Sequence, residues 1–267
     1  MKIFLRFHII FQLCFLSICT AVETKNPKGV FTAVFWEKYK SESFSYAPWG
    51  NEKEANATMI DISVGSSSLS RRFVYYGDGK LNFYEKRRPR EWEEDQNESK
   101  VKEQKKLSAD FELPKSSETP IEYLLLFVNK KKNGLWKIYP IPFSQNQVPF
   151  GQYNFISQSK EQLYLLFGKN EIILPSGKSK VSPAVVEDGK RGIELKAMIQ
   201  KKGQYLEVFN QKWGHSENMR GIFFLRLNEN KLNVKRVIEF EQPLSAASGY
   251  NINPLIFNQN NEGKSKR

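Results

Sequence analysis

The fold is decided by a run of six apolar residues, Tyr123-Leu124-Leu125-Leu126-Phe127-Val128. A polar stretch with Asn, Lys and Gly follows at residues 129–134, and the β-rich run Leu135-Trp136-Lys137-Ile138-Tyr139-Pro140 comes next. Two strand-like runs on either side of a short polar segment predict a β-hairpin. An uninterrupted apolar run of this length suits a strand that is buried on both faces, between two layers of the protein.

The rest of the chain repeats this pattern of short β-rich runs separated by turns. Further hairpins are predicted at residues 72–84, 162–174, 193–213 and 221–240, the first of them around the turn Gly77-Asp78-Gly79. Single strands are predicted at residues 31–37, 58–64, 107–113, 151–157 and 178–183. About fifteen strands result, and no segment has the period of an amphipathic helix. The predicted fold class is all-β.

Two halves of the chain resemble each other. Residues 222–227 and 232–238 parallel residues 123–128 and 136–141 at an offset of about 100 residues. Residues 73–77 parallel residues 163–168 at an offset of about 90. This likeness suggests a duplicated unit of roughly seven strands, although generic hairpins would also produce it by chance.

Short strands with frequent turn signals favour a sandwich or a barrel. We therefore expect two tandem antiparallel β-sandwich (Ig-like) units, over residues 28–143 and 147–241. The joint between them falls where Pro140, Pro142 and Pro149 stiffen a polar stretch.

The first residues resemble an export signal. Lys2 and Arg6 precede a mostly apolar stretch, and Cys19-Thr20-Ala21 supplies small residues before a cleavage point. These parts define a secretory signal peptide over residues 1–21, whose apolar stretch is shorter than the roughly 20 residues that span a bilayer. Lipidation at Cys19 and an uncleaved anchor stay open as alternatives, the first because Leu16-Ser17-Ile18-Cys19 resembles a lipobox.

Cleavage after Ala21 would remove both cysteines, Cys14 and Cys19, and would leave His215 as the single histidine. Export without disulfides is common in the bacterial periplasm, so we expect a periplasmic or secreted bacterial protein. No later apolar run exceeds about ten residues, and no transmembrane segment is therefore expected after cleavage.

Two segments are too polar to pack. Residues 86–106 form a loop that mixes charges of both signs around Trp92, and residues 245–267 form an Asn/Gln/Ser-rich tail that ends in Lys264-Ser265-Lys266-Arg267. With little apolar surface to bury, both are expected to be poorly ordered.

The sequence contains few side chains that could catalyse a reaction or bind a metal ion. His215 lies between Trp213 and Glu217, but a Ser/His/acid triad needs groups that converge from separate elements. We therefore expect His215 to be an exposed loop residue. Zinc, copper and haem lack their usual Cys and His ligands, and we expect no cofactor.

A glycosidase would need two facing carboxylates. The candidates on predicted strands are Asp61, Asp110, Glu112, Glu194 and Glu207. Most strand carboxylates point to water, and the sequence does not say whether any two meet. We expect no enzymatic activity, with a carbohydrate-binding or carbohydrate-active protein as the alternative.

Positive charge is the strongest global signal, with a net charge of +12. Basic clusters occur at Arg71-Arg72, Lys86-Arg87-Arg88, Lys130-Lys131-Lys132, residues 178–180, Lys190-Arg191 and Lys201-Lys202. If these clusters meet at one end of a sandwich, they could attract an anionic polysaccharide or lipid head groups. If they stay apart, they keep the chain soluble and protect strand edges from pairing. Nucleic acid is not expected as a partner of an exported chain.

Loop aromatics are the second kind of candidate contact, because aromatic rings pack on the apolar faces of sugars. Trp49 and Trp92 lie in predicted loops, whereas the other tryptophans lie in predicted strands. The candidate ligand contacts are therefore Trp49, Trp92, Lys130, Lys131 and Lys132.

The run Pro149-Phe150-Gly151-Gln152-Tyr153-Asn154-Phe155, residues 163–168 and Leu174-Pro175-Ser176-Gly177 together resemble a known pattern. It is similar to the repeated Ig-like or transthyretin-like modules of uncharacterised exported proteins from the planctomycete–verrucomicrobial group. The resemblance covers about a third of the chain and implies a β-sandwich and export. It implies no activity and no functional residue.

The sequence thus predicts an exported, non-enzymatic binding or structural module of the bacterial envelope. Its partners would be envelope proteins, contacted through sheet edges and basic loops, or an anionic polysaccharide.

Overall fold

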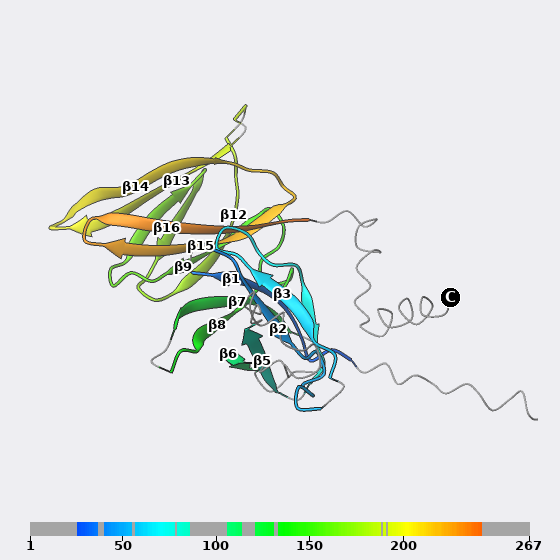
Figure 1. Cartoon of the computed structure of the whole chain (residues 1–267). Helices are drawn as coiled ribbons and strands as arrows, with labels where there is room; N and C mark the ends of the chain where they lie inside the picture. The colour runs from blue at the N-terminus through cyan, green and yellow to red at the C-terminus, as the bar shows by residue number, and fades with distance from the viewer. Residues whose placement is uncertain are drawn as a thin grey trace, which may run out of the picture.

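The computed structural model describes residues 26–36, 40–54, 57–77, 79–85, 106–113, 121–130, 133–187, 189–190 and 192–241. Within these ranges the chain forms sixteen strands and no helix, which confirms the all-β prediction (Figure 1). The signal peptide at residues 1–21, the tail at residues 245–267 and nearly all of the charged loop at residues 86–106 lie outside the described residues.

The strands fall into two successive groups of eight, here named the first unit and the second unit. The first unit contains β1 (Gly29–Phe35), β2 (Glu42–Tyr46), β3 (Ile60–Val64), β4 (Phe73–Tyr75), β5 (Lys80–Glu85), β6 (Lys106–Glu112), β7 (Ile121–Lys130) and β8 (Trp136–Pro142). The second unit contains β9 (Gln152–Ser157), β10 (Leu163–Phe167), β11 (Asn170–Leu174), β12 (Ser179–Pro183), β13 (Gly192–Lys201), β14 (Gln204–Gly214), β15 (Met219–Asn228) and β16 (Lys231–Phe240).

The second unit is a sandwich of two four-stranded sheets. Their strand orders are β11-β10-β13-β14 and β12-β9-β15-β16. Alternate side chains of both sheets point inward, among them Leu165, Leu195 and Phe223, and they form a core between the sheets.

The first unit is a single eight-stranded sheet in the order β3-β2-β5-β6-β8-β7-β1-β4. The sheet curls into a half-barrel around a core rich in aromatic residues, including Phe31, Phe83 and Phe127. The expected two-sheet sandwich is therefore wrong for this unit. A parallel bridge between Ala109 of β6 and Trp136 of β8 joins its two four-stranded halves into one sheet.

The two units have the same topology, because each is built from the strand orders 4-1-7-8 and 3-2-5-6 when its strands are counted from its own start. The first and seventh strands pair in parallel in both units, Gly29 opposite Ile121 in one and Tyr153 opposite Gly221 in the other. The expected fully antiparallel arrangement is wrong at these pairs. An immunoglobulin domain pairs its first strand with its second, so the Ig-like connectivity is wrong as well.

The shared topology also tests the two parallels within the sequence. Residues 123–140 and residues 222–238 are equivalent, since they form β7–β8 and β15–β16. Residues 73–77 and residues 163–168 are not equivalent, because β4 corresponds to β12 and β10 corresponds to β2. The repeated unit has eight strands and not seven; the strand missing from the sequence prediction is β2.

A third core joins the units face to face. Val34 and Leu124 from the outer face of the first sheet pack against Ile222 and Phe224 of β15. Figure 1 shows the resulting layers, with β13 and β14 above, β9, β15 and β16 in the middle and the first unit below. The apolar runs in β7 and β15 are thus buried between layers, as predicted.

Candidate functional site

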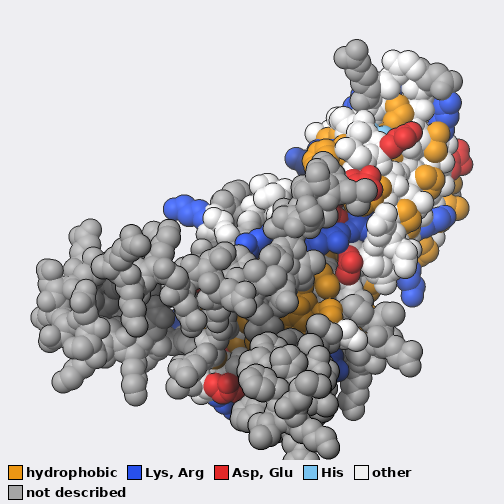
Figure 2. Space-filling model, turned by 90° about the vertical axis from the view of Figure 1, so that its right-hand side faces the viewer, with side chains coloured by type: hydrophobic (Ala, Val, Ile, Leu, Met, Phe, Trp, Pro, Cys, Tyr) orange, Lys and Arg blue, Asp and Glu red, His pale blue; other side chains and the backbone are white. Residues whose placement is uncertain are grey.

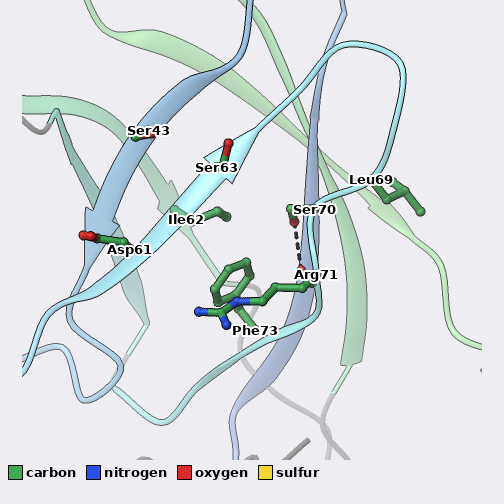
Figure 3. Close-up of a pocket in the computed structure, with 8 residues that line it drawn as sticks. All are labelled: Ser43, Asp61, Ile62, Ser63, Leu69, Ser70, Arg71 and Phe73. Atoms are coloured by element: carbon green, nitrogen blue, oxygen red, sulfur yellow. Dashed lines mark hydrogen bonds between the residues drawn. The ribbon is translucent and has the colours of Figure 1, made fainter. Parts of the chain in front are cut away.

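The candidate site is a groove at the seam of the first unit, where the two end strands of the curled sheet approach each other. Among the described strands, β3 pairs only with β2 and β4 pairs only with β1, so their outer edges face the seam. The groove between them has a volume of about 710 Å³ (Figure 3). We call it the seam groove, and its walls are Ser43, Asp61, Ile62, Ser63, Leu69, Ser70, Arg71 and Phe73.

The segment that connects β3 to β4, residues 65–72, explains why the seam stays open. This segment runs along the second half of β1: the amide of Phe35 donates to Gly65 O (2.8 Å), and the amide of Ser70 donates to Ala33 O (3.0 Å). The Ser70 hydroxyl accepts a further hydrogen bond from the amide of Ala33 (2.8 Å). The connection therefore takes the place of a strand beside β1, and no described strand pairs with the outer edge of β3.

The seam groove has an apolar floor and a polar rim. Ile62 and Phe73 belong to the core of the half-barrel and form the floor, whereas Asp61 and Ser63 are exposed on the rim. This division follows from β3 itself, whose successive side chains alternate between the two faces of the sheet. A ligand in the groove would thus meet apolar contacts on one side and hydrogen-bonding groups on the other.

Arg71 supplies the positive charge of the groove. Figure 3 shows its side chain extending from the 69–73 segment into the gap towards β3, and its guanidinium lies 4.9 Å from the centre of the Phe73 ring. No carboxylate of the described residues pairs with this guanidinium. Because Arg71 is exposed, it can receive an anionic group from a ligand.

The corresponding edge of the second unit is closed. Only residues 175–178 separate β11 from β12, the equivalents of β3 and β4. The Asn170 side chain of β11 donates to Pro183 O of β12 (2.7 Å), and the amide of Lys169 donates to Val185 O (3.3 Å). The longer connection in the first unit is thus the local difference that accompanies the open seam.

The candidate contacts proposed from the sequence lie elsewhere. Trp49 is half-buried and stacks on Tyr76 with ring centres 4.4 Å apart, while Pro48 O accepts a hydrogen bond from the amide of Tyr76. Tyr76 therefore covers one face of the Trp49 indole, which holds the turn against the half-barrel. Lys130 ends β7, and Trp92, Lys131 and Lys132 lie outside the described residues.

His215 is half-buried and has a structural partner. Its Nδ1 lies 2.9 Å from the hydroxyl of Tyr153, whose ring packs in the core of the second unit. Burial lowers the pKa of His215 below its usual value, and burial raises the pKa of Tyr153 to about 12. His215 lies in the loop between β14 and β15, as expected, but the expectation that it is exposed is wrong.

The strand carboxylates considered for sugar hydrolysis do not stand opposite one another. Asp61, Asp110, Glu112, Glu194 and Glu207 lie opposite Ser45, Asn82, Lys80, Lys212 and Met198, respectively. Lys80 bridges Asp110 at 3.1 Å. In the part of the chain that the structure describes, no three His, Cys, Asp or Glu side chains form a group that could hold a metal ion, and no helix is long and apolar enough to cross a membrane.

Sequence reasoning found two residues of the seam groove, Asp61 as a strand carboxylate and Arg71 within a basic pair. It missed Ser43, Ser63 and Phe73 as site residues, because their convergence depends on the curl of the sheet. One signal in the sequence could have pointed to the groove. It is the long connection between the strand predicted at residues 58–64 and the strand predicted to begin at residue 72. The sequence matches no protein-family model, and no curated protein is significantly similar to it.

Proposed function

We propose that this protein is an exported, non-enzymatic binding module of the bacterial envelope and that its ligand lies in the seam groove. The observation that carries the proposal is the difference between two equivalent edges in one molecule: β11 and β12 close on each other, whereas β3 and β4 leave a groove of about 710 Å³. This volume lies within the range of about 300–1,000 Å³ typical of ligand sites. Export rests on the amino-terminal sequence pattern alone.

The charge of the chain supports an anionic ligand. The net charge of the whole chain is +12, and the Arg71 guanidinium in the groove pairs with no carboxylate of the described residues. Figure 2 shows Lys and Arg side chains at several separate places on one face, interspersed with Asp and Glu. Attraction would come from the distributed charge of the chain and recognition from the groove, so binding would weaken as salt rises.

Ser43 and Ser63 favour a second ligand class, an anionic polysaccharide, because their hydroxyls can exchange hydrogen bonds with sugar hydroxyls. Trp49 contributes less to this alternative than expected, since Tyr76 covers one face of its ring. For the fold, we propose kinship with transthyretin-like modules; its support is the eight-strand unit that the chain contains twice.

The test fills the groove without touching the core. Ser63→Trp places a large side chain on the rim of the seam groove, and Ser179→Trp is the matched control at the exposed start of β12, on the closed edge of the second unit. The probes are an acidic polysaccharide, alginate, and a random peptide library, with binding measured by interferometry at low and moderate salt.

We expect one probe class to bind and Ser63→Trp to weaken that binding by at least about tenfold, while Ser179→Trp leaves it unchanged. Equal binding by both variants, or binding by neither probe class, would contradict the proposed function. Substrate turnover by the protein would contradict its non-enzymatic part.

A further inference from the structure

The edge of β3 offers a template for one more strand. β3 pairs with β2 along its whole length, from Ile60 opposite Tyr46 to Val64 opposite Glu42, without a bulge. In an antiparallel pair, alternate residues direct their amide and carbonyl groups away from the partner strand. These groups of β3 face the seam, where no described strand pairs with them. Free strand edges bind extended peptides through such groups.

The two-sided lining of the seam groove matches the alternation of a strand. An extended segment beside β3 would direct every second side chain to the floor, towards Ile62 and Phe73. The side chains between them would face the rim, where Asp61, Ser63 and Arg71 lie, so an acidic side chain would have to stand at the Arg71 end, away from Asp61. The side chains of the bound segment would therefore have to alternate between apolar and polar.

The rim also selects for charge. The Arg71 guanidinium lies in the gap without a carboxylate from the described residues, and Phe73 covers one of its faces. A carboxylate that approaches from a bound segment would form a charge-assisted hydrogen bond with this guanidinium. The net charge of +12 would attract the same acidic segment from a distance.

We propose that the partner of this protein is a polypeptide, and that an extended, alternately apolar segment of it binds in the seam groove as an added strand on β3, with an acidic side chain against Arg71. This inference rests on the proposed function, since it names the ligand class of the same groove. The anionic polysaccharide is the competing outcome.

The experiment uses a library of seven-residue peptides with Val, Ile or Leu at alternate positions and all residue types between them. The best binder is then resynthesised in two forms, each N-methylated on one of the two alternating sets of amides. N-methylation removes a donor without removing a side chain, so it isolates main-chain pairing from contacts of the groove walls.

We expect selected peptides to carry Glu or Asp between the apolar positions, and one of the two N-methylated forms to bind at least about tenfold more weakly than the parent. Ser63→Trp should abolish the binding, and Ser179→Trp should not. Arg71→Glu should weaken the acidic peptide and strengthen its Lys-substituted version, which a purely structural role of Arg71 would not produce.

The outcomes separate the two proposals. If alginate binds in a Ser63-dependent manner and no peptide does, the strand inference is wrong and the groove remains the binding site. If peptides bind but both N-methylated forms match the parent, the added strand is wrong. If neither probe class binds the groove, both proposals are wrong.

Discussion

Arg220 is a fully buried cation close to the contact between the two units. Its side chain is 0% exposed, its Nε donates to Glu239 Oε2 (2.6 Å) and its Nη1 donates to Val148 O (2.9 Å). The guanidinium also packs over the rings of Phe143 and Phe150. The other oxygen of Glu239 accepts from Arg72 of the first unit (3.1 Å), so this carboxylate links a buried cation to a cation near the seam.

Replacing Glu239 should therefore be severe. Glu239→Ala would leave the buried Arg220 guanidinium without a counter-charge, and we expect the free energy of unfolding to fall by about 3–5 kcal/mol. Chemical denaturation measures this loss. The control is Glu187→Gln, which breaks the exposed pair with Lys190 and should leave the free energy of unfolding almost unchanged. Equal effects of the two substitutions would contradict the structural role of Arg220.

His215 should make stability depend on pH. Burial lowers its pKa in the folded protein below the ordinary value of 6.5, so the unfolded chain binds a proton at a higher pH than the folded chain does. Its stabilising contribution is present above pH 6.5 and is lost as the pH falls through the folded pKa. Unfolding free energies at pH 8 and pH 5 should differ less in His215→Gln than in the natural chain, whereas an unchanged difference would assign the pH dependence to other groups.

For the site, the sequence showed which residue types were available, but it did not show that these residues lie close together. Arg71 stood out as half of a basic pair and Asp61 as a strand carboxylate, each with an ordinary surface explanation. Phe73 reads as a core residue, and it is one, at 5% exposure. Only the curl that brings the end strands of the sheet together makes these residues walls of one groove, and no local pattern encodes that curl.

At the scale of elements, hairpins with short polar turns were predicted correctly. The strands of β7–β8, β10–β11, β13–β14 and β15–β16 pair as the alternation and the turns indicated. The hairpin at residues 72–84 is wrong, although both of its strands exist. β4 pairs with β1, and β5 lies between β2 and β6, so the Gly77 turn carries the chain across the half-barrel. A turn signal in the sequence predicts where a strand ends, but it does not predict which strand the next one pairs with.

Gly221 shows how closely the middle strands of the second unit pack. A Cβ atom at this position of β15 would lie 2.5 Å from Val237 O and 2.7 Å from the Ile238 side chain. We expect Gly221→Ala to lower the free energy of unfolding by about 1–3 kcal/mol, because the strands on either side would have to move apart. Gly214→Ala in β14 is the matched control, since a Cβ there meets no atom within 4 Å. Thermal melts of the two variants should separate clearly, and identical melting temperatures would contradict this packing.

At the scale of the whole molecule, the three cores form a continuous stack. β15 contributes to two of them, because Phe223 faces the core of the second unit and Phe224 faces the first unit. Trp36, which follows β1, meets the Phe224 ring edge-to-face at 5.3 Å. The side chain of Lys235 in β16 donates to the carbonyls of Phe35 and Trp36. From these contacts we expect the two units to unfold as one cooperative body.

Phe224→Ala should therefore destabilise both units together. The variant leaves a cavity between the units, and we expect a loss of about 3–5 kcal/mol. Hydrogen exchange followed by mass spectrometry can read β7 and β10 separately, and both should lose the same protection. Phe240→Ala removes a side chain that is 53% exposed and should have little effect. Faster exchange in one unit alone would show that the units unfold independently.

The parallel pairing of the first and seventh strands has a consequence for the order in which the chain can mature on the ribosome. β1 is among the earliest described segments to be synthesised, yet its parallel neighbour β7 is translated only after five further strands. β9 likewise waits for β15. Each half must therefore persist as an incomplete sheet during most of its own synthesis, with an apolar strand exposed to solvent. A holdase chaperone would be needed during that interval.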